Sequence, residues 1–123
     1  MNRSLNKILI IGNLGRDPET RYSQSGMPVT SFSVATDRSW IDSSGEEHSE
    51  TEWFNVICWN SLADSCKASL YKGSRVFIEG RLQTRHWKDS DDTKHSSIEI
   101  VANEIVTLEE QKHHSNYIKE NVY

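Results

Sequence analysis

Hydrophobic residues recur at every second position over much of this chain, a pattern typical of β-strands that turn one face toward a core. The first such segment, residues 5–14, contains an apolar run from Ile8 to Ile11 followed by glycines at positions 12 and 15. Turn-forming residues fill positions 16–28, so we expect a loop there. We predict five strands, over residues 5–14, 29–36, 53–59, 74–87 and 98–108.

One helix is predicted between the third and fourth strands, because apolar side chains recur every four positions from Leu62 to Leu70. We expect Asn60 or Ser61 to cap its N-terminus, Asp64 to lie in its first turn, and Gly73 to end it. This order of elements indicates an all-β fold. The architecture we predict is a closed five-stranded Greek-key barrel with one short helix between strands 3 and 4, which plugs one end. We see no internal repeat.

Large apolar side chains occupy both faces of the third predicted strand. One face begins at Trp53 and ends at Trp59, and the other includes Val56 and Cys58. A small barrel buries only one face of each strand. The second face must therefore contact something other than the core of the domain.

Length and charge limit the classes of protein to which this chain can belong. The 123 residues fit one domain, which we place at residues 1–108, and a short polar tail at residues 109–123 that we expect to be flexible. No apolar run is long enough to span a bilayer or to serve as a signal peptide, so we expect a protein that starts in the cytosol or an equivalent compartment. The net charge of −4 argues against a generally basic nucleic-acid binder. However, residues 37–52 hold six carboxylates and one arginine, which leaves the rest of the chain at +1.

The four tryptophans are the first candidates for binding chemistry. An indole offers a wide π-face on which an unpaired nucleobase can stack. Tryptophans in small domains also serve as core or subunit-interface residues, but two of these four lie on the strand face opposite the predicted core. The candidate stacking residues are Trp40, Trp53, Trp59 and Trp87.

Cationic side chains accompany these rings. Arg81 and Arg85 alternate onto the same face of the fourth strand as Trp87, and two further cations lie at the entry to the first strand. Exposed strand faces also carry charge for solubility alone, and for Arg21 both interpretations stay open. The candidates for contact with a phosphate backbone are Arg3, Lys7, Arg21, Arg81 and Arg85.

Enzymatic and metal chemistry find little support in the sequence. Cys58 and Cys66 lack metal-ligand spacing and are expected to be buried thiols, and no carboxylate or cysteine joins the pair His113–His114 at ligand spacing. The aspartates of residues 89–92 lack the glycine and glutamate of a calcium loop. No nucleophile–base pair or phosphate-binding glycine loop is present. We therefore predict no catalytic residues, no metal and no cofactor.

Several segments, taken in order, resemble the bacterial-type single-stranded DNA-binding proteins. The resemblance covers residues 6–108 and is carried by residues 6–19 (NKILIIGNLGRDPE), 32–36 (FSVAT), 51–53 (TEW), 72–82 (KGSRVFIEGRL) and 84–87 (TRHW). It implies an OB-fold that assembles as a homotetramer and binds single-stranded DNA without sequence preference, during DNA replication, recombination and repair. It also places the family's stacking aromatics on the four tryptophans and its backbone cations on Arg3, Lys7, Arg21 and Arg85.

The chain departs from the family pattern at several positions. Asn55, Gln83 and His86 stand where members often carry a base, and Phe54 stands where an interface histidine is common. The chain ends at Tyr123 without the acidic tip through which many bacterial members recruit enzymes, so we do not expect that recruitment. We expect a cytoplasmic, nucleoid-associated protein or an organellar one. Two other hypotheses are a protein-interaction OB module of primosome type and, more remotely, a metal-assisted nuclease.

Overall fold

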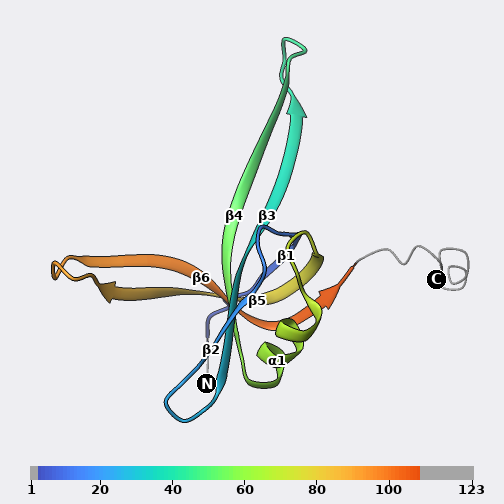
Figure 1. Ribbon diagram of the computed structural model, residues 1–123. Coiled ribbons are helices and arrows are strands. Elements are labelled where there is room, and N and C mark those ends of the chain that lie inside the picture. Colours follow the sequence, from blue (N-terminus) through green and yellow to red (C-terminus); the bar gives the residue numbers. More distant parts are fainter. Residues whose placement is uncertain (1–2, 109–123) are drawn as a thin grey trace, which may run out of the picture.

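The computed structural model describes residues 3–108, which form a mostly β structure with one helix (Figure 1). The elements in chain order are β1 (Ile8–Leu14), β2 (Glu19–Tyr22), β3 (Pro28–Ile41), β4 (Glu47–Trp59), α1 (Asn60–Ser69), β5 (Arg75–Lys88) and β6 (Lys94–Thr107). The predicted tail at residues 109–123 lies outside the described residues. Within residues 3–108, the single helix is too short and too polar to cross a bilayer.

Five strands close into a barrel. Around the barrel the order is β1, β5, β6, β4 and β3, and β3 returns to β1 through the pairs Asn13–Ala35 and Leu14–Val34. The β4–β6 pair is parallel and the others are antiparallel. With α1 inserted between the third and fourth barrel strands, this is the OB-fold architecture that the sequence predicts.

The short strand β2 corrects the prediction of a loop over residues 16–28. Residues 19–22 pair antiparallel with the start of β3, and the Thr20 and Thr30 hydroxyls lie 2.7 Å apart. The turn-forming residues flank this strand instead of filling the segment: Gly26, with φ of 88°, lies in the turn that joins β2 to β3. A four-residue strand between two turns is too short to show a two-residue period.

The core lies inside the barrel and under the helix. Its largest fully buried side chains include Phe32, Ile78 and Ile100, and α1 adds Ala63 and Cys66. The buried hydroxyl of Thr30 donates to the carbonyl of Ala63 at 3.0 Å, which ties the helix to β3. Cys58 and Cys66 are free and buried, as the sequence predicts.

The helix begins without the predicted side-chain cap. It runs from Asn60 to Ser69, so Asp64 lies beyond its first turn, and no side chain caps the N-terminus. The strand β4 passes into the helix without a loop, and Asn60 makes this turn with a φ of 59°, a backbone region that asparagine tolerates. The helix ends four residues before Gly73, whose φ of 93° serves the following turn into β5.

Two long hairpins project beyond the barrel in different directions (Figure 1). We call the outer part of β3–β4, residues 36–52, the first arm and that of β5–β6, residues 84–98, the second arm. Strand pairing continues to Ile41–Glu47 in the first arm and to Lys88–Lys94 in the second. The acidic stretch at residues 37–52, which lies outside the five predicted strands, is therefore mostly paired strand, and only residues 42–46 form the turn.

Candidate nucleic-acid interface

The outer surface of the neighbouring strands β4, β6 and β5 forms one continuous face, which we call the outer platform. Val56 and Cys58 point into the core, so the alternate residues of β4 point outward. The pairs Ile57–Val101 and Arg81–Val101 carry this outward face from β4 across β6 to β5. By alternation the outer platform holds Trp53, Asn55, Ile57, Trp59, Glu99, Val101, Arg81, Gln83, Arg85 and Trp87.

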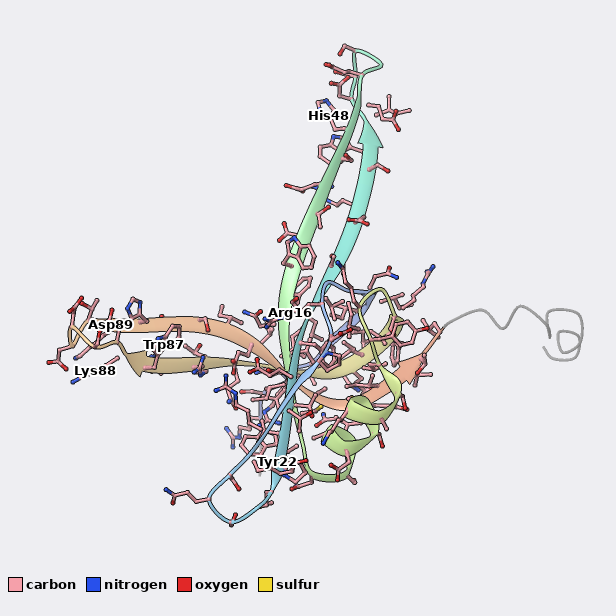
Figure 2. The ribbon with its side chains drawn as sticks, in the orientation of Figure 1. Arg16, Tyr22, His48, Trp87, Lys88 and Asp89 are labelled. Atoms are coloured by element: carbon pink, nitrogen blue, oxygen red, sulfur yellow. The ribbon has the colours of Figure 1, made fainter. Side chains whose placement is uncertain are left out.

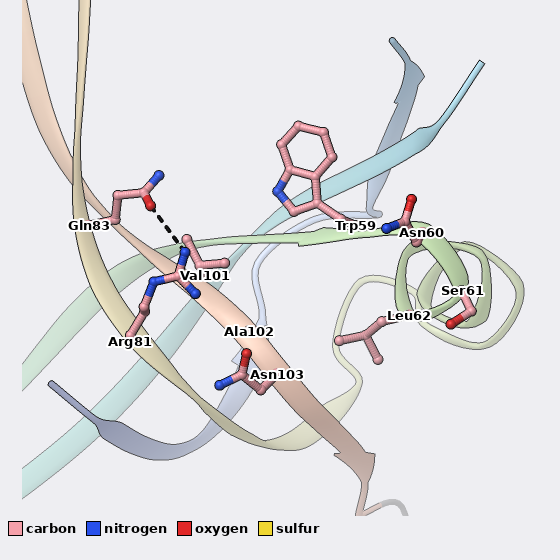
Figure 3. A pocket seen from close by; sticks show the side chains of 9 residues that line it. All are labelled: Trp59, Asn60, Ser61, Leu62, Arg81, Gln83, Val101, Ala102 and Asn103. Atoms are coloured by element: carbon pink, nitrogen blue, oxygen red, sulfur yellow. Dashed lines mark hydrogen bonds between the residues drawn. The ribbon is translucent and has the colours of Figure 1, made fainter. Parts of the chain in front are cut away.

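A groove of about 650 Å³ lies at one end of the outer platform (Figure 3). The Trp59 indole, 45% exposed, stands on one side of it, and Arg81 and Gln83 stand on the other. Arg81 Nη2 donates to Gln83 Oε1 at 3.4 Å. The complete lining is Trp59, Asn60, Ser61, Leu62, Arg81, Gln83, Val101, Ala102 and Asn103.

A second pocket, of about 420 Å³, lies along the N-terminal segment. Arg81 lines both pockets, and Arg3 lines the second. Asn6 holds this segment in place, because its amide side chain donates to the carbonyl of Leu82 at 2.8 Å and accepts from the Leu82 N–H at 3.0 Å. Arg81 thus lies between the Trp59 groove and the pocket that Arg3 lines, and both guanidinium groups are of the kind that binds phosphate.

Trp53 lies at the other end of the β4 edge of the outer platform and is 58% exposed. Its ring covers Gly15, where a Cβ atom would come within 2.5 Å of the indole Cζ3. The backbone at Gly15 is fixed by a hydrogen bond from its N–H to the carbonyl of Ser33 at 3.0 Å. Only glycine leaves room for this ring position, so the glycine supports the orientation of the ring.

Trp87 lies at the far end of the outer platform, on the second arm (Figure 2). The guanidinium carbon of Arg85 lies 4.8 Å from the centre of its ring, and His95 stacks on it with centroids 5.3 Å apart. Trp87 is 37% exposed. The ring is therefore held in a fixed environment and still presents surface to solvent.

Trp40 is separate from the other three indoles. Alternation along β3 places it on the same side as the core residues Phe32 and Val34, so it lies on the face of the first arm opposite Trp53. Glu50 and Glu52 lie farther along that face, opposite Arg38 and Thr36, and Arg38 lies 4.4 Å from the ring centre. The structure thus brings together Trp53, Trp59 and Trp87 on one face and places Trp40 in acidic surroundings on another.

The five predicted cations also divide into two groups. Lys7 forms an ion pair with Glu79 at 3.1 Å, and Arg21 forms one with Glu19 at 2.9 Å. The Arg21 hydrogen bond and charge lower the pKa of the Glu19 carboxyl. Arg3, Arg81 and Arg85 form no ion pair with any of residues 3–108. These three arginines are the ones most available to a phosphate.

Three side chains of the site were not recognised from the sequence. Asn60 and Asn103 line the groove beside Trp59, and Gln83, treated only as a departure from a basic residue, lines it with Arg81. Gln83 could have been found by its alternation with Arg81 and Arg85. The two asparagines depend on where α1 and the end of β6 lie relative to β5, which no local pattern specifies.

One group of side chains has the composition of a metal site. Ligand atoms of Asp42, Glu46 and His48 lie within 4.8 Å of one another in the turn of the first arm. The Asp42 carboxylate is already used, however, because Oδ1 accepts from the N–H groups of Ser44 and Glu46 and Oδ2 lies 2.8 Å from His48 Nε2. We therefore assign no metal to this turn.

Comparisons with known proteins identify the family. The family model of the single-strand binding protein family matches residues 5–108, and the chain belongs to this family. It is 46% identical over 110 residues to single-stranded DNA-binding protein 1 of Chlorobaculum tepidum, a match that covers 88% of this chain and 67% of the relative. It is 44% identical over 105 residues to the single-stranded DNA-binding protein of Neisseria meningitidis serogroup A, covering 85% of this chain. The match spans only 60% of that second relative.

Two solved structures share the fold. A Plasmodium falciparum SSB in complex with ssDNA superposes with a TM-score of 0.80 at 34% identity, covering 89% of this chain and all of that one. A deletion mutant of the Thermus aquaticus single-stranded DNA-binding protein superposes with a TM-score of 0.76 at 31% identity. That match covers 89% of this chain and 53% of the other. The fold and family predicted from the sequence are confirmed.

Proposed function

We propose that this protein binds single-stranded DNA without sequence preference and protects it during DNA replication, recombination and repair. The observation that carries the proposal is the outer platform, where three exposed indoles share one face with Arg81 and Arg85. Family membership and the likeness to a structure described as an ssDNA complex support it. We propose that the protein acts where its DNA lies, in the cytoplasm with the nucleoid or in an organelle.

The proposed mechanism combines stacking with charge neutralisation. Unpaired bases lie on the rings of Trp53, Trp59 and Trp87, and every base can do so because every base has a π-face. Phosphates between these bases contact Arg3, Arg81 and Arg85. Paired bases in a duplex are already stacked and have no free face, so duplex DNA is a poor ligand. The protein itself has no chemical step to perform in this mechanism, and we propose that it is not an enzyme.

The acidic first arm explains how a chain of net charge −4 can bind a polyanion. This arm extends away from the barrel along the paired strands of β3 and β4 (Figure 1), and it carries its carboxylates with it. The arginines of the outer platform lie on the barrel and the second arm. We propose that the DNA path follows the outer platform and leaves the first arm aside, with Trp40 contributing less than the other indoles.

Self-association is the second part of the proposal. Leu9 and Ile11 on the outward side of β1 are 58% and 50% exposed, and Val106 nearby on β6 is also exposed. Between Ile8 and Gly12, β1 pairs with β5 on one side and has no pairing partner within residues 3–108 on the other. An apolar strand with an open edge is suited to pairing with another copy. We propose the homotetramer that the family resemblance implies.

A fluorescence titration tests the function, and light scattering tests the assembly. Unlabelled single-stranded homopolymer should quench the tryptophan fluorescence to saturation. Weak, non-saturating DNA binding would instead favour a protein-interaction module. Light scattering should report four subunits for the wild type and fewer for Leu9→Glu.

A further inference from the structure

The tips of the two arms carry the same short sequence motif, which we did not recognise as a repeat in the sequence. In each, an arginine, a tryptophan and an aspartate follow one another at every second position, and a histidine comes six residues after the aspartate. The motif comprises Arg38, Trp40, Asp42 and His48 in the first arm and Arg85, Trp87, Asp89 and His95 in the second.

The aspartate has the same contacts in both tips. Oδ1 of Asp89 accepts the N–H groups of Asp91 and Thr93 at 2.9 and 3.0 Å, and Oδ2 lies 2.8 Å from His95 Nε2. Asp42 makes the equivalent contacts, at 2.9 Å to two turn N–H groups and 2.8 Å to His48 Nε2. One carboxylate thus connects the backbone of the turn to the imidazole ring.

The imidazole in turn stacks on the indole directly across the strand pair. Trp87 pairs with His95 and Trp40 with His48 in the strand register. The ring planes differ by 19° in the second arm and 18° in the first, with centroids 5.3 Å apart in both. In each case the arginine two residues before the tryptophan lies against the same indole. The indole is therefore held by neighbours that the aspartate fixes to the turn.

We propose that His95, fixed by Asp89, is a positioning residue that sets the plane of the Trp87 indole for stacking of single-stranded DNA. This proposal rests on the proposed function. A tryptophan on a two-stranded arm has no core to hold its ring. If the ring becomes ordered only when DNA binds, the free energy of ordering it reduces the affinity. The Asp89–His95 pair orders the ring beforehand. His48 and Asp42 do the same for Trp40, which lies off the outer platform.

The alternative role of His95 is to stabilise the hairpin turn alone. The two roles differ in their dependence on Trp87. A positioning residue acts through the indole, so its removal has no further effect once the indole is gone. A residue that only stabilises the turn has the same effect with or without Trp87.

A double-mutant cycle in the full chain separates these roles. We expect His95→Ala to weaken binding of an oligothymidylate by roughly three- to tenfold, the range that ordering one side chain on binding produces. His95→Phe keeps a ring to stack on and should retain most of the affinity. In the Trp87→Ala background, His95→Ala should change the affinity less than twofold. His86→Ala is the matched control, because His86 is a histidine on the same arm, paired with Ser96 on the face opposite Trp87 and His95. It should bind as the wild type does.

A second measurement does not involve DNA. In the free protein, the indole Nε1–H resonance of Trp87 should shift or broaden in His95→Ala and Asp89→Asn, and remain in place in His86→Ala. The proposal is overturned if this resonance is unchanged in His95→Ala, or if His95→Ala weakens DNA binding equally with and without Trp87. A wild-type protein that does not bind the oligothymidylate overturns the proposed function, and the role in DNA binding with it.

Discussion

The indole of Trp53 rests on the α-carbon of Gly15, so closely that a methyl group there would come 2.5 Å from Cζ3 and 2.8 Å from Cη2. Contacts this short force the ring to move. We therefore predict that Gly15→Ala displaces Trp53 and weakens single-strand binding by roughly tenfold, a value within the range for loss of one stacked base in proteins of this class. A filter-binding or fluorescence titration measures the effect.

The control for this prediction removes the ring. In a Trp53→Ala background the clash at position 15 is absent, so adding Gly15→Ala should leave the DNA affinity unchanged. If the double variant binds much more weakly than Trp53→Ala alone, the glycine acts on the site by a route other than the indole.

The two arm tryptophans should differ in their contribution. Trp87 lies on the outer platform beside Arg85, whereas Trp40 lies on the other face of an arm rich in carboxylates. We predict that Trp87→Ala weakens binding of a homopolymer by about 1–3 kcal/mol, the range known for base stacking in this class of protein. Trp40→Ala should weaken binding by less than about half of the effect of Trp87→Ala. Equal effects in parallel titrations would mean that the DNA also follows the first arm.

The ion pairs predict which arginines neutralise phosphates. Arg81 forms no ion pair with residues 3–108, whereas Arg21 is paired with Glu19. For single strands, the slope of log affinity against log salt falls by about 0.7 for each phosphate that the protein no longer neutralises. Arg81→Ala should therefore reduce the slope by about 0.7, and Arg21→Ala by clearly less. Glu19→Gln frees Arg21 and should strengthen binding at low salt; no change would exclude Arg21 from the DNA path.

The turn of the first arm should resist acid. The hydrogen bond from His48, followed by those from Ser44 and Glu46, holds the pKa of the Asp42 carboxyl far below its ordinary value. A carboxyl whose pKa is lowered by folding stabilises the folded form above its unfolded pKa of about 3.9, and this stability is lost as the pH falls through the lower folded pKa. The resonance of the Ser44 amide, which donates to Asp42, should therefore stay in place down to about pH 3.9 and shift only below it.

Asp42→Asn is the control for the acid prediction, because its side chain does not titrate. Its Ser44 amide should lose the shift that protonation of Asp42 causes in the wild type. A wild-type transition centred above about pH 4 would contradict the lowered pKa.

The sequence was sufficient for the barrel and for the β5 strand of the second arm, and insufficient for the first arm and the start of β6. Alternation predicts a strand wherever one face is buried, as at Val34 or Val56. The arms have solvent on both faces, so their strands extend to Ile41 and from Glu47 without an apolar period. They are held instead by cross-strand pairs such as Arg38–Glu50 at 2.9 Å.

The sequence predicted the types of residue in the candidate site. It predicted only in part which of these residues lie together on one face. The alternation of Arg81, Arg85 and Trp87 placed them correctly on one face. The division of the cations into paired and unpaired groups depends on neighbours such as Glu79, which reaches Lys7 across β1 and β5. The stacking of His95 on Trp87 depends on the register of β5 against β6, which the turn between these strands sets.

The most direct test of the account is a comparison of single-stranded and duplex DNA of the same length in one tryptophan-fluorescence titration. Stacking of bases on the outer platform predicts strong, saturable quenching by the single strand, little quenching by the duplex, and loss of much of the signal in Trp53→Ala/Trp87→Ala. Equal binding of the duplex, or saturable binding of the single strand without quenching, would contradict the claim that exposed indoles hold the bases.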